Sequence, residues 1–241
     1  MLARRLLATP DGELAPALLG PAEQAALGTA LALRDAIKAR PGKARLEVLA
    51  VGPARDDEVL RYALACGADA AVRVWHPALE GTDYYAIARV LAATVRLRGF
   101  TYVLCGDRSS DQGLGATGPA VAEFLGVPHL SGARDVRLDD APGALRARHH
   151  GGGFTRHLRV RAPAVLCVAD GPRPPAPEAL TPTRSRKRPQ AIDLTTLGLM
   201  AEELRHRRHL TGAPVERPTA HAEILPSAED LVRRLRDEGL I

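Results

Sequence analysis

The chain has 241 residues, of which 46% are hydrophobic and 25% are charged. These proportions match those of average globular proteins and exclude a wholly disordered chain, and the length suffices to bury a core without disulfides or metals. Cys66, Cys105 and Cys167 show no C-x-x-C spacing, which is typical of a reduced protein and not of a disulfide scaffold or zinc ribbon. No apolar run approaches the ~20 residues of a membrane span, and the first residues contain no signal-peptide core. We therefore expect a cytoplasmic protein without membrane insertion.

Positive charge is concentrated in the last part of the sequence. The net charge is +5, and residues 141–241 hold 17 basic and 11 acidic side chains, with the densest basic cluster at residues 184–188. A basic tail favours nucleic-acid binding as a first hypothesis. Aromatic residues, however, make up only 3% of the chain, so single-stranded bases would find no stacking platform. We expect no nucleic-acid binding and interpret the cluster as a solvated or protein-facing arm.

The first half of the sequence alternates between apolar runs and helical periodicity. Gly52-Pro53 follows the first apolar run, and Gly67 ends the helical pattern behind it. The predicted strands cover residues 44–51, 70–74 and 102–105, and the predicted helices cover residues 55–66, 83–98 and 117–125. Strands that alternate with helices of this length are typical of βαβ units. The pattern predicts an α/β fold, with a Rossmann-like, open, mainly parallel sheet and flanking helices.

The sequence changes character after residue 130. Residues 145–161 predict a hairpin around Gly151-Gly152-Gly153, and residues 162–168 predict a further buried strand. Residues 171–191 are rich in proline and basic residues, which is typical of an extended segment, and residues 227–241 predict a terminal helix with Ser227 as N-cap and Gly239 at its end. We therefore expect a nucleotide-binding domain over residues 1–170 and an extended partner-binding arm with a terminal helix over residues 171–241.

Residues 106–118 are the stretch that most clearly predicts a binding site. They follow a predicted strand and precede a predicted helix, and open α/β sheets bind ligands at that edge. The glycines allow backbone N–H groups to converge, and Thr117-Gly118 opens a helix whose N-terminus favours a phosphate. The stretch fits neither G-x-G-x-x-G nor G-x-x-x-x-G-K-[ST]. Its spacing leaves open a phosphate-binding loop or a plain glycine-rich connector.

Several motifs occur here in an order known from one family. The matching segments are Gly20-Pro21-Ala22-Glu23 with the helix to Leu33, Gly52-Pro53, residues 61–69, the loop residues Gly106, Asp111, Thr117 and Gly118, residues 124–128, residues 161–165, Leu180 with the basic run behind it, and residues 231–241. Over residues 19–241 the chain resembles the β subunit of electron transfer flavoproteins. No single motif is specific to that family, but the order of the motifs is.

The resemblance implies a bound nucleotide. Such β subunits usually hold a structural AMP in this loop, and electron-bifurcating members hold a second FAD there, so the choice between AMP and FAD stays open. The implied cofactor-binding residues are Gly20, Pro21, Val51, Gly52, Gly106, Ser109, Asp111, Gly113, Gly115, Ala116, Thr117 and Gly118. We expect no metal site and no catalytic residue, since the family's β subunit binds and docks without breaking bonds.

The resemblance also implies partners. The β subunit pairs with an α subunit that carries FAD, and the heterodimer takes electrons from flavin dehydrogenases to a quinone oxidoreductase or another acceptor. The family recognises dehydrogenases through a leucine on its arm, so the implied docking residues are Leu180, Arg184, Arg186 and Lys187. The alternative is a stand-alone adenine-nucleotide-binding regulatory protein of the same fold, which would explain the loop but not the long C-terminal arm.

The sequence departs from the family at its start. Family members begin with a hydrophobic strand that supplies the innermost strand of the sheet and one wall of the nucleotide site. This sequence begins with Met1 to Arg5 and soon reaches Asp11-Gly12, a hairpin that normally follows that strand. Either the start codon is misassigned or the nucleotide site is half-built. The acidic run of the family's loop is also reduced to Asp111.

Overall fold

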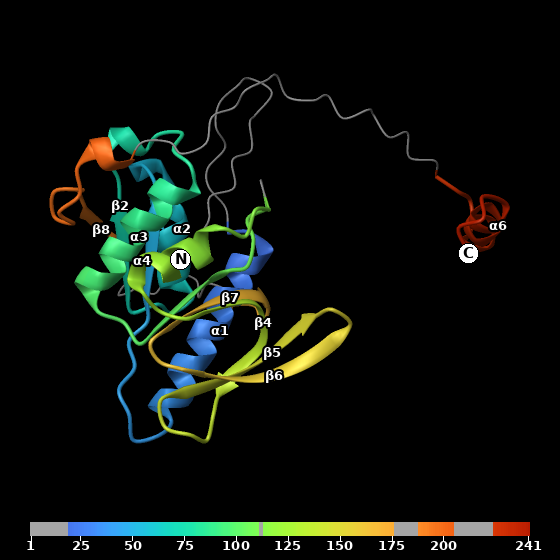
Figure 1. Ribbon diagram of the computed structural model, residues 1–241, viewed down its shortest axis with the longest axis horizontal. Coiled ribbons are helices and arrows are strands. Elements are labelled where there is room, and N and C mark those ends of the chain that lie inside the picture. Colours follow the sequence, from blue (N-terminus) through green and yellow to red (C-terminus); the bar gives the residue numbers. More distant parts are fainter. Residues whose placement is uncertain (1–18, 111–112, 176–187, 205–223) are drawn as a thin grey trace. The chain divides into compact units, whose positions relative to one another are not determined.

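The computed structural model describes residues 19–110, 113–175, 188–204 and 224–241. The chain divides into two compact units, residues 1–208 and residues 209–241. In the described part, the first unit contains two β-sheets with the helices that cover them, and the second contains one helix (Figure 1). None of the described helices is long and apolar enough to span a membrane.

The smaller sheet is wholly parallel. Its three strands, in spatial order, are β1 (Glu47–Val51), β2 (Ala70–Val74) and β8 (Gln190–Ile192). A short 3-10 helix (Ala54–Asp56) and α2 (Asp57–Ala65) connect β1 to β2. Leu60 and Leu64 of α2 are buried in one cluster with Val48 of β1. A helix that packs back on its own strands is the crossover that parallel pairing requires.

The larger sheet combines parallel and antiparallel pairing. Its five strands, in spatial order, are β3 (Tyr102–Gly106), β7 (Ala164–Asp170), β4 (His129–Leu138), β5 (Ala144–Gly151) and β6 (Phe154–Arg161). The β3–β7 and β7–β4 pairs are parallel, whereas the β4–β5 and β5–β6 pairs are antiparallel. β5 and β6 form the predicted hairpin, with Gly152 and Gly153 at its turn.

Helices cover both faces of the β3–β7 pair. The three helices are α1 (Pro21–Lys38), α3 (Tyr84–Arg98) and α4 (Thr117–Leu125). Leu104 of β3 and Val168 of β7 pack with α1, whereas the neighbouring Cys105 and Cys167 pack with α3 and α4. Because successive side chains of a strand point to opposite faces, this alternation shows that both faces are buried. All three cysteines are buried as free thiols.

Local sequence signals set the ends of these helices. The Asp83 carboxylate accepts hydrogen bonds from the N–H groups of Tyr85 and Ala86, at 3.1 and 3.3 Å, where α3 begins. Gly126 follows α4 in the left-handed conformation, at φ 69° and ψ 37°, and ends that helix. Both signals can be read from the sequence, and the predicted bounds agree with the structure to within one residue for α3 and at both ends for α4.

The predicted α/β fold with an open, mainly parallel sheet is confirmed, but the structure adds β4 and β8 to the predicted strands. β4 carries Arg134, Asp135 and Arg137, which break the apolar alternation expected of a strand. Its pairing with β5 shifts register between Arg134 and Arg137, where Asp135 adopts a φ of 48°. The irregular backbone and the charged side chains together explain why the pattern did not predict this strand.

Residues 190–204 pack on the first unit's own core. Ile192 and Leu194 are buried with Val72 and Val74 of β2, and Leu204, in a 3-10 helix (Ala201–Leu204), joins the same cluster. A 2.9 Å ion pair between Arg89 and Glu203 ties this segment to α3. This segment therefore contributes to the sheet that contains β1. The sequence analysis instead placed residues 171–241 in an extended partner-binding arm with a terminal helix.

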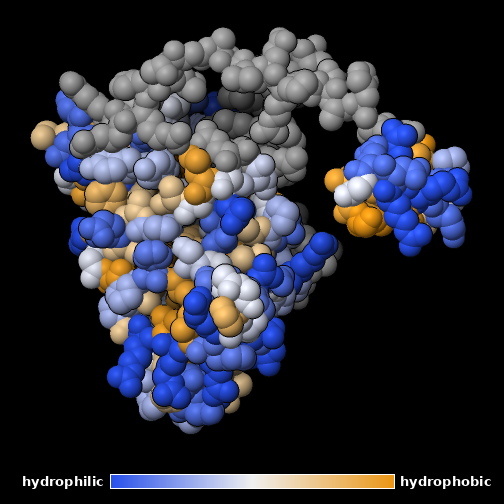
Figure 2. Space-filling view, turned by 45° about the vertical axis from the view of Figure 1, so that its right-hand side comes forward, coloured by the Kyte–Doolittle hydropathy of each residue, from blue (hydrophilic) through white to orange (hydrophobic). Residues whose placement is uncertain are grey.

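The second unit contains α6 (Ala228–Asp237). As predicted, the Ser227 hydroxyl caps the helix by accepting the Asp230 N–H at 3.1 Å, and Gly239 follows it at a φ of 67°. Figure 2 shows an apolar patch beside hydrophilic surface on this helix. The exposed large apolar side chains of α6 and the residues behind it are Leu231, Val232, Leu240 and Ile241.

One buried carboxylate ties three strands of the larger sheet together. Asp139 directly follows β4 and is 4% exposed. Its carboxylate accepts the Ala141 N–H at 2.9 Å and forms ion pairs with Arg146 of β5 at 3.2 Å and with Arg159 of β6 at 3.0 Å. The Ala141 hydrogen bond, with those to Arg159 and Arg146, lowers the pKa of Asp139 to about 2.

Replacing Asp139 with Asn should destabilise the protein at pH 7, because the two arginines lose their shared anion. The folded-state pKa of about 2 lies below the value of about 3.9 in an unfolded chain, so this stabilisation is complete above pH ~4 and is lost as the pH falls through about 2. Urea midpoints should therefore differ between wild type and Asp139→Asn at pH 7 and converge near pH 2. Asp140→Asn is the control, since Asp140 is exposed and contacts only Arg146 among the described residues. Equal midpoints at pH 7 would contradict this account.

Candidate functional site

The predicted site residues lie where β1 and β3 end. Gly52 follows β1, and Gly106 is the last residue of β3. The amino ends of the two strands also lie close together. There, Arg98, which precedes β3, forms a 2.6 Å ion pair with Glu47 at the start of β1. Near the other ends, Val51 of β1 packs against the cluster that contains Cys105 of β3, so the two strands run in the same direction and their carboxyl ends share one edge. Open α/β sheets bind ligands at that edge.

Asp107 fixes the first turn of the loop. Its N–H donates to the Val168 carbonyl at 2.9 Å, and its carboxylate accepts the Gly132 N–H at 2.6 Å, so the loop is tied to both β7 and β4. Arg108 lies beside it, with 3.6 Å between the guanidinium and the carboxylate. The sequence analysis did not select Asp107. Its position directly after a strand that ends in glycine is the signal that could have identified it.

Two glycines bend the remainder of the loop. Gly113 and Gly115 have φ values of 63° and 61°, in the left-handed region that favours glycine. A Cβ on Gly115 would lie 3.1 Å from the Asp107 carbonyl oxygen. The Gly113 N–H donates to the Ser109 hydroxyl at 3.3 Å, which holds the turn closed. The structure thus brings Ser109, Gly113 and Gly115 together in one loop.

The loop leads directly into the N-terminus of α4. Ala116 is the N-cap residue and Thr117 the first helical residue, and both are half-buried. The N-cap residue, Ala116, has no side-chain acceptor with which to cap this helix end. The first N–H groups of a helix have no partner within the helix, and the dipole adds positive potential there. This end of α4 can therefore hold an anionic group such as a phosphate.

Gly118 lets α4 approach the sheet closely. A Cβ at this position would lie 2.4 Å from the Cys167 Sγ and 2.8 Å from the Cys105 Sγ. The two sulfur atoms are 3.6 Å apart, and the hydrogen bond with Cys167 together with burial raises the pKa of Cys105 well above its ordinary value. The Cys105 thiol therefore stays protonated, and the pair serves as a packing surface beneath the loop.

Glu23 of α1 lies against the loop. A Cβ on Gly106 would come within 2.5 Å of one Glu23 carboxylate oxygen, and a Cβ on Gly20 would come within 2.5 Å of both the other oxygen and the Ser110 hydroxyl. Gly20 and Gly106 thus allow the start of α1 to meet the end of β3. The structure places Gly20 beside Ser110 of the loop and adds the buried Glu23 carboxylate next to it.

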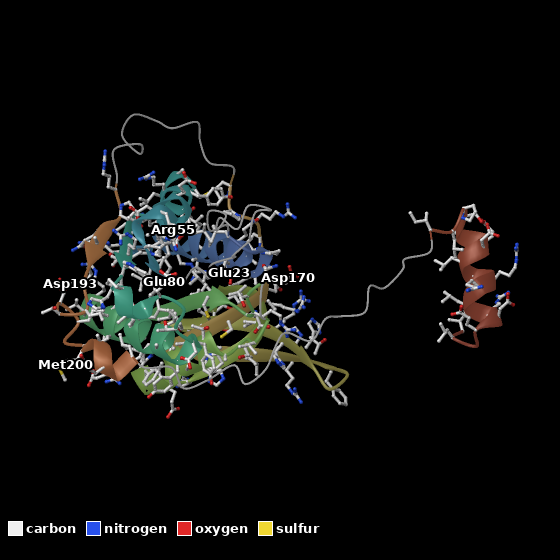
Figure 3. All side chains as sticks on the ribbon, turned by 90° about the horizontal axis from the view of Figure 1, so that it is seen from above. Glu23, Arg55, Glu80, Asp170, Asp193 and Met200 are labelled. Atoms are coloured by element: carbon white, nitrogen blue, oxygen red, sulfur yellow. The ribbon has the colours of Figure 1, made fainter. Side chains whose placement is uncertain are left out.

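The sequence analysis did not place Glu23 in the site, although Glu23 follows the selected Gly20-Pro21. The helix dipole alone favours an acidic residue in the first turn of a helix. The presence of Glu23 in the sequence therefore does not indicate that its side chain is buried. In the view of Figure 3, Glu23 lies between Arg55 and Asp170, which mark the carboxyl ends of β1 and β7.

Val51 and Gly52 form a second half of the site. The Gly52 N–H donates to the Val74 carbonyl at 3.0 Å, and a Cβ on Gly52 would lie 2.3 Å from a carboxylate oxygen of the buried Asp56. Val51 packs against the cluster that contains Cys105. The structure therefore places the predicted residues along one edge in two halves, one on each sheet.

Some of the predicted residues cannot be placed. Asp111 and the predicted docking residues Leu180, Arg184, Arg186 and Lys187 lie outside the described residues. Within the described ranges, no three histidine, cysteine, aspartate or glutamate side chains gather in a metal-binding cluster.

Replacing Gly118 with Ala should destabilise the protein by about 1–3 kcal/mol, because the added methyl group overpacks the contact with two buried sulfur atoms. Thermal unfolding would measure this effect. The double variant Gly118→Ala, Cys167→Ala should recover part of the loss, since it removes the nearer sulfur. An unfolding temperature of Gly118→Ala equal to that of wild type would show that α4 can move away at no cost.

Comparison with known proteins agrees with this geometry. The family model for the electron transfer flavoprotein domain matches residues 12–195. The electron transfer flavoprotein subunit beta of Methylophilus methylotrophus is 35% identical over 162 residues, which cover 65% of this chain and 61% of that protein. The subunits beta of Mycobacterium tuberculosis and of Sus scrofa are both 31% identical, over 81% and 88% of this chain and 74% and 83% of their own lengths. The chain therefore belongs to the electron transfer flavoprotein β-subunit family.

Proposed function

We propose that this protein is the β subunit of a heterodimeric electron transfer flavoprotein and that residues 106–118 hold the phosphate of an adenine nucleotide, either AMP or a second FAD. The observation that carries the proposal is the loop between β3 and α4, where two left-handed glycines precede a helix N-terminus whose N-cap residue, Ala116, has no side-chain acceptor. Backbone N–H groups supply the contacts in such a loop, so they tolerate the loss of acidic side chains around Asp111.

The residues present fit such a ligand. Gly113 and Leu114 are exposed, so a phosphate can reach the loop from solvent. Thr117 adds a hydroxyl at the first position of α4. The proposed roles are therefore phosphate binding by the backbone of residues 113–118 and approach of the nucleotide along the edge that ends in Gly52.

The proposed partner is an α subunit that carries FAD. The observation that favours a partner over the stand-alone regulator is the match of most of the chain to electron transfer flavoprotein subunits beta. The partner's flavin would carry the electrons from flavin dehydrogenases to a quinone oxidoreductase or similar acceptor. This chain's own residues would bind and dock and would catalyse no step themselves.

The central test is the nucleotide content of the complex. Co-purified with an FAD-binding α subunit, wild type should release an adenine nucleotide that mass analysis identifies as AMP or FAD. Gly115→Val should lose most of it, because valine strains at a φ of 61° and its Cβ would crowd the Asp107 carbonyl. A complex that contains no nucleotide in the β subunit would contradict the proposal.

Gly152→Val is the matched control for Gly115→Val. Gly152 has a φ of 60° and open space around it, and it lies at the tip of the β5–β6 hairpin. Valine at position 152 imposes the same backbone strain as valine at position 115, but it does not contact the loop. Equal nucleotide loss in both variants would show that strain, and not the loop, causes the effect.

Dehydrogenase docking is the second proposal, and it rests on the basic arm. Leu180→Ala should slow electron transfer from the dehydrogenase without changing flavin content, because an apolar anchor supplies affinity at an interface. Reversing the charges of Arg186 and Lys187 should slow transfer most at low salt, since exposed charges are screened beyond ~8 Å at 0.15 M salt. Stopped-flow kinetics at several salt concentrations measure both effects.

Charge reversal at Arg40 and Lys43 is the control for Arg186 and Lys187. Both residues are exposed between α1 and β1, and the change in net charge is the same. This control should leave the transfer rate near that of wild type. Wild-type rates for the arm variants at every salt concentration would reduce the arm to a solvated tail.

A further inference from the structure

Two of the three buried cysteines lie side by side beneath the candidate site. Cys105 of β3 and Cys167 of β7 are register partners on this parallel pair of strands, and their sulfur atoms are 3.6 Å apart. The two residues are 62 positions apart along the chain, so the pairing of the strands is what brings them together. The third cysteine, Cys66, lies in a different core cluster, which contains neither of them.

The spacing of the strands permits a bond between the two sulfur atoms. Neighbouring strands lie about 4.8 Å apart, which falls within the range of roughly 4.4–6.8 Å between Cα atoms that disulfides bridge. Both side chains point to the same face of the sheet, where they share a cluster with Val121 and Ala122 of α4. Closing the sulfur–sulfur distance from 3.6 Å to about 2.05 Å therefore needs rotation of side chains and no change of strand pairing.

The surroundings make the two sulfur atoms chemically unequal. Cys105 is fully buried, and its S–H donates to the Cys167 sulfur. That hydrogen bond lowers the pKa of Cys167, and the Ser131 hydroxyl adds to this effect, whereas burial and the Asp107 carboxylate oppose it. Cys167 is therefore the sulfur that supplies a thiolate nucleophile, and Cys105 is the proton donor beside it.

The first turn of α4 covers the pair. A Cβ on Gly118 would meet both sulfur atoms, so this turn lies directly on them. Its N-cap residue, Ala116, supplies no side-chain acceptor, and a missing cap costs a helix end about 1 kcal/mol. Helix ends open locally at a lower free energy than the whole protein unfolds. A small oxidant can thus reach Cys167 from the loop while the sheet stays folded.

We propose that Cys105 and Cys167 are a redox-active dithiol, which hydrogen peroxide converts into an intramolecular disulfide beneath the candidate site. In the first step, the Cys167 thiolate attacks one peroxide oxygen and the O–O bond breaks. Uptake of one proton then leaves a sulfenic acid and one water. In the second step, the Cys105 sulfur attacks the Cys167 sulfur, and the sulfenic hydroxyl leaves with the Cys105 proton as a second water. The two sulfur atoms lose two electrons, which the peroxide takes up.

The disulfide would be reversible and would alter the surface beneath α4. Facing positions on neighbouring strands give the bridge little freedom to reach its preferred geometry, and strained disulfides are readily reduced. Drawing the sulfur atoms together also withdraws part of the surface on which Gly118 packs, so the first turn of α4 loosens. Formation of the disulfide does not depend on whether this turn binds a nucleotide.

The test treats the folded protein with hydrogen peroxide and maps its thiols by mass spectrometry. The expected product has lost two hydrogen atoms, contains a crosslink between the peptides of Cys105 and Cys167, and returns to the dithiol on treatment with dithiothreitol. Cys66 is the internal control, because it is buried in another cluster and burial raises its pKa. Its thiol should be lost at least about tenfold more slowly than the other two.

Single variants separate the roles of the two sulfur atoms. In Cys105→Ser the serine hydroxyl can still donate to Cys167, so dimedone, which traps sulfenic acids, should label Cys167 after peroxide treatment. In Cys167→Ser, Cys105 should stay unlabelled. Cys66→Ser is the matched control, and it should form the disulfide at the wild-type rate.

Several results would overturn the proposal. Three free thiols in folded, peroxide-treated wild type would do so, as would a Cys167 sulfinic acid without a crosslink. Loss of the Cys66 thiol as fast as that of the pair would also overturn it, since oxidation would then follow unfolding. Amide hydrogens in the first turn of α4 should exchange at least about threefold faster in the oxidised protein, and unchanged exchange would contradict the link to α4.

Discussion

The burial of β3 and β7 on both faces is the constraint on which the rest of this structure depends. Leu104 and Val168 need α1, and Cys105 and Cys167 need α3 and α4, so the three helices are fixed against one pair of strands. Gly118 sets how close α4 can come, since any side chain there would meet two sulfur atoms. The loop between β3 and α4 is held at both ends by this packing, and Asp107 fixes its first turn. The shape of the candidate site is thus a consequence of the core.

The sequence predicted the elements whose signals are local. β2 and α4 have the predicted bounds, because an apolar run or a helical period stands there between glycines. β4 was not predicted because Arg134 and Arg137 break the apolar alternation of a strand. The structure tolerates both arginines because β4 pairs on one side with the partly exposed β5. β8 escaped because its three residues are a strand only through pairing with β2. Both depend on contacts distant in sequence, which no local pattern records.

The same distinction between local signals and distant contacts applies to the residues of the candidate site. The glycines of the loop could be predicted, since left-handed backbone and close approach leave a residue-type signature. The burial of Glu23 could not, because it arises where α1 meets β3, about 80 residues apart along the chain. The resemblance to a family rests on the order of the motifs along the sequence, and the structure adds the distances between them.

The terminal helix cannot be explained by its own residues alone. A helix of ten residues is below the length at which isolated helices are stable in water. Its Ser227 cap and the 2.7 Å Arg234–Glu238 pair each add at most about 1 kcal/mol. Leu231 and Val232 are not buried by the described residues of their own unit. Stable folding of this helix therefore depends on contacts beyond the helix itself.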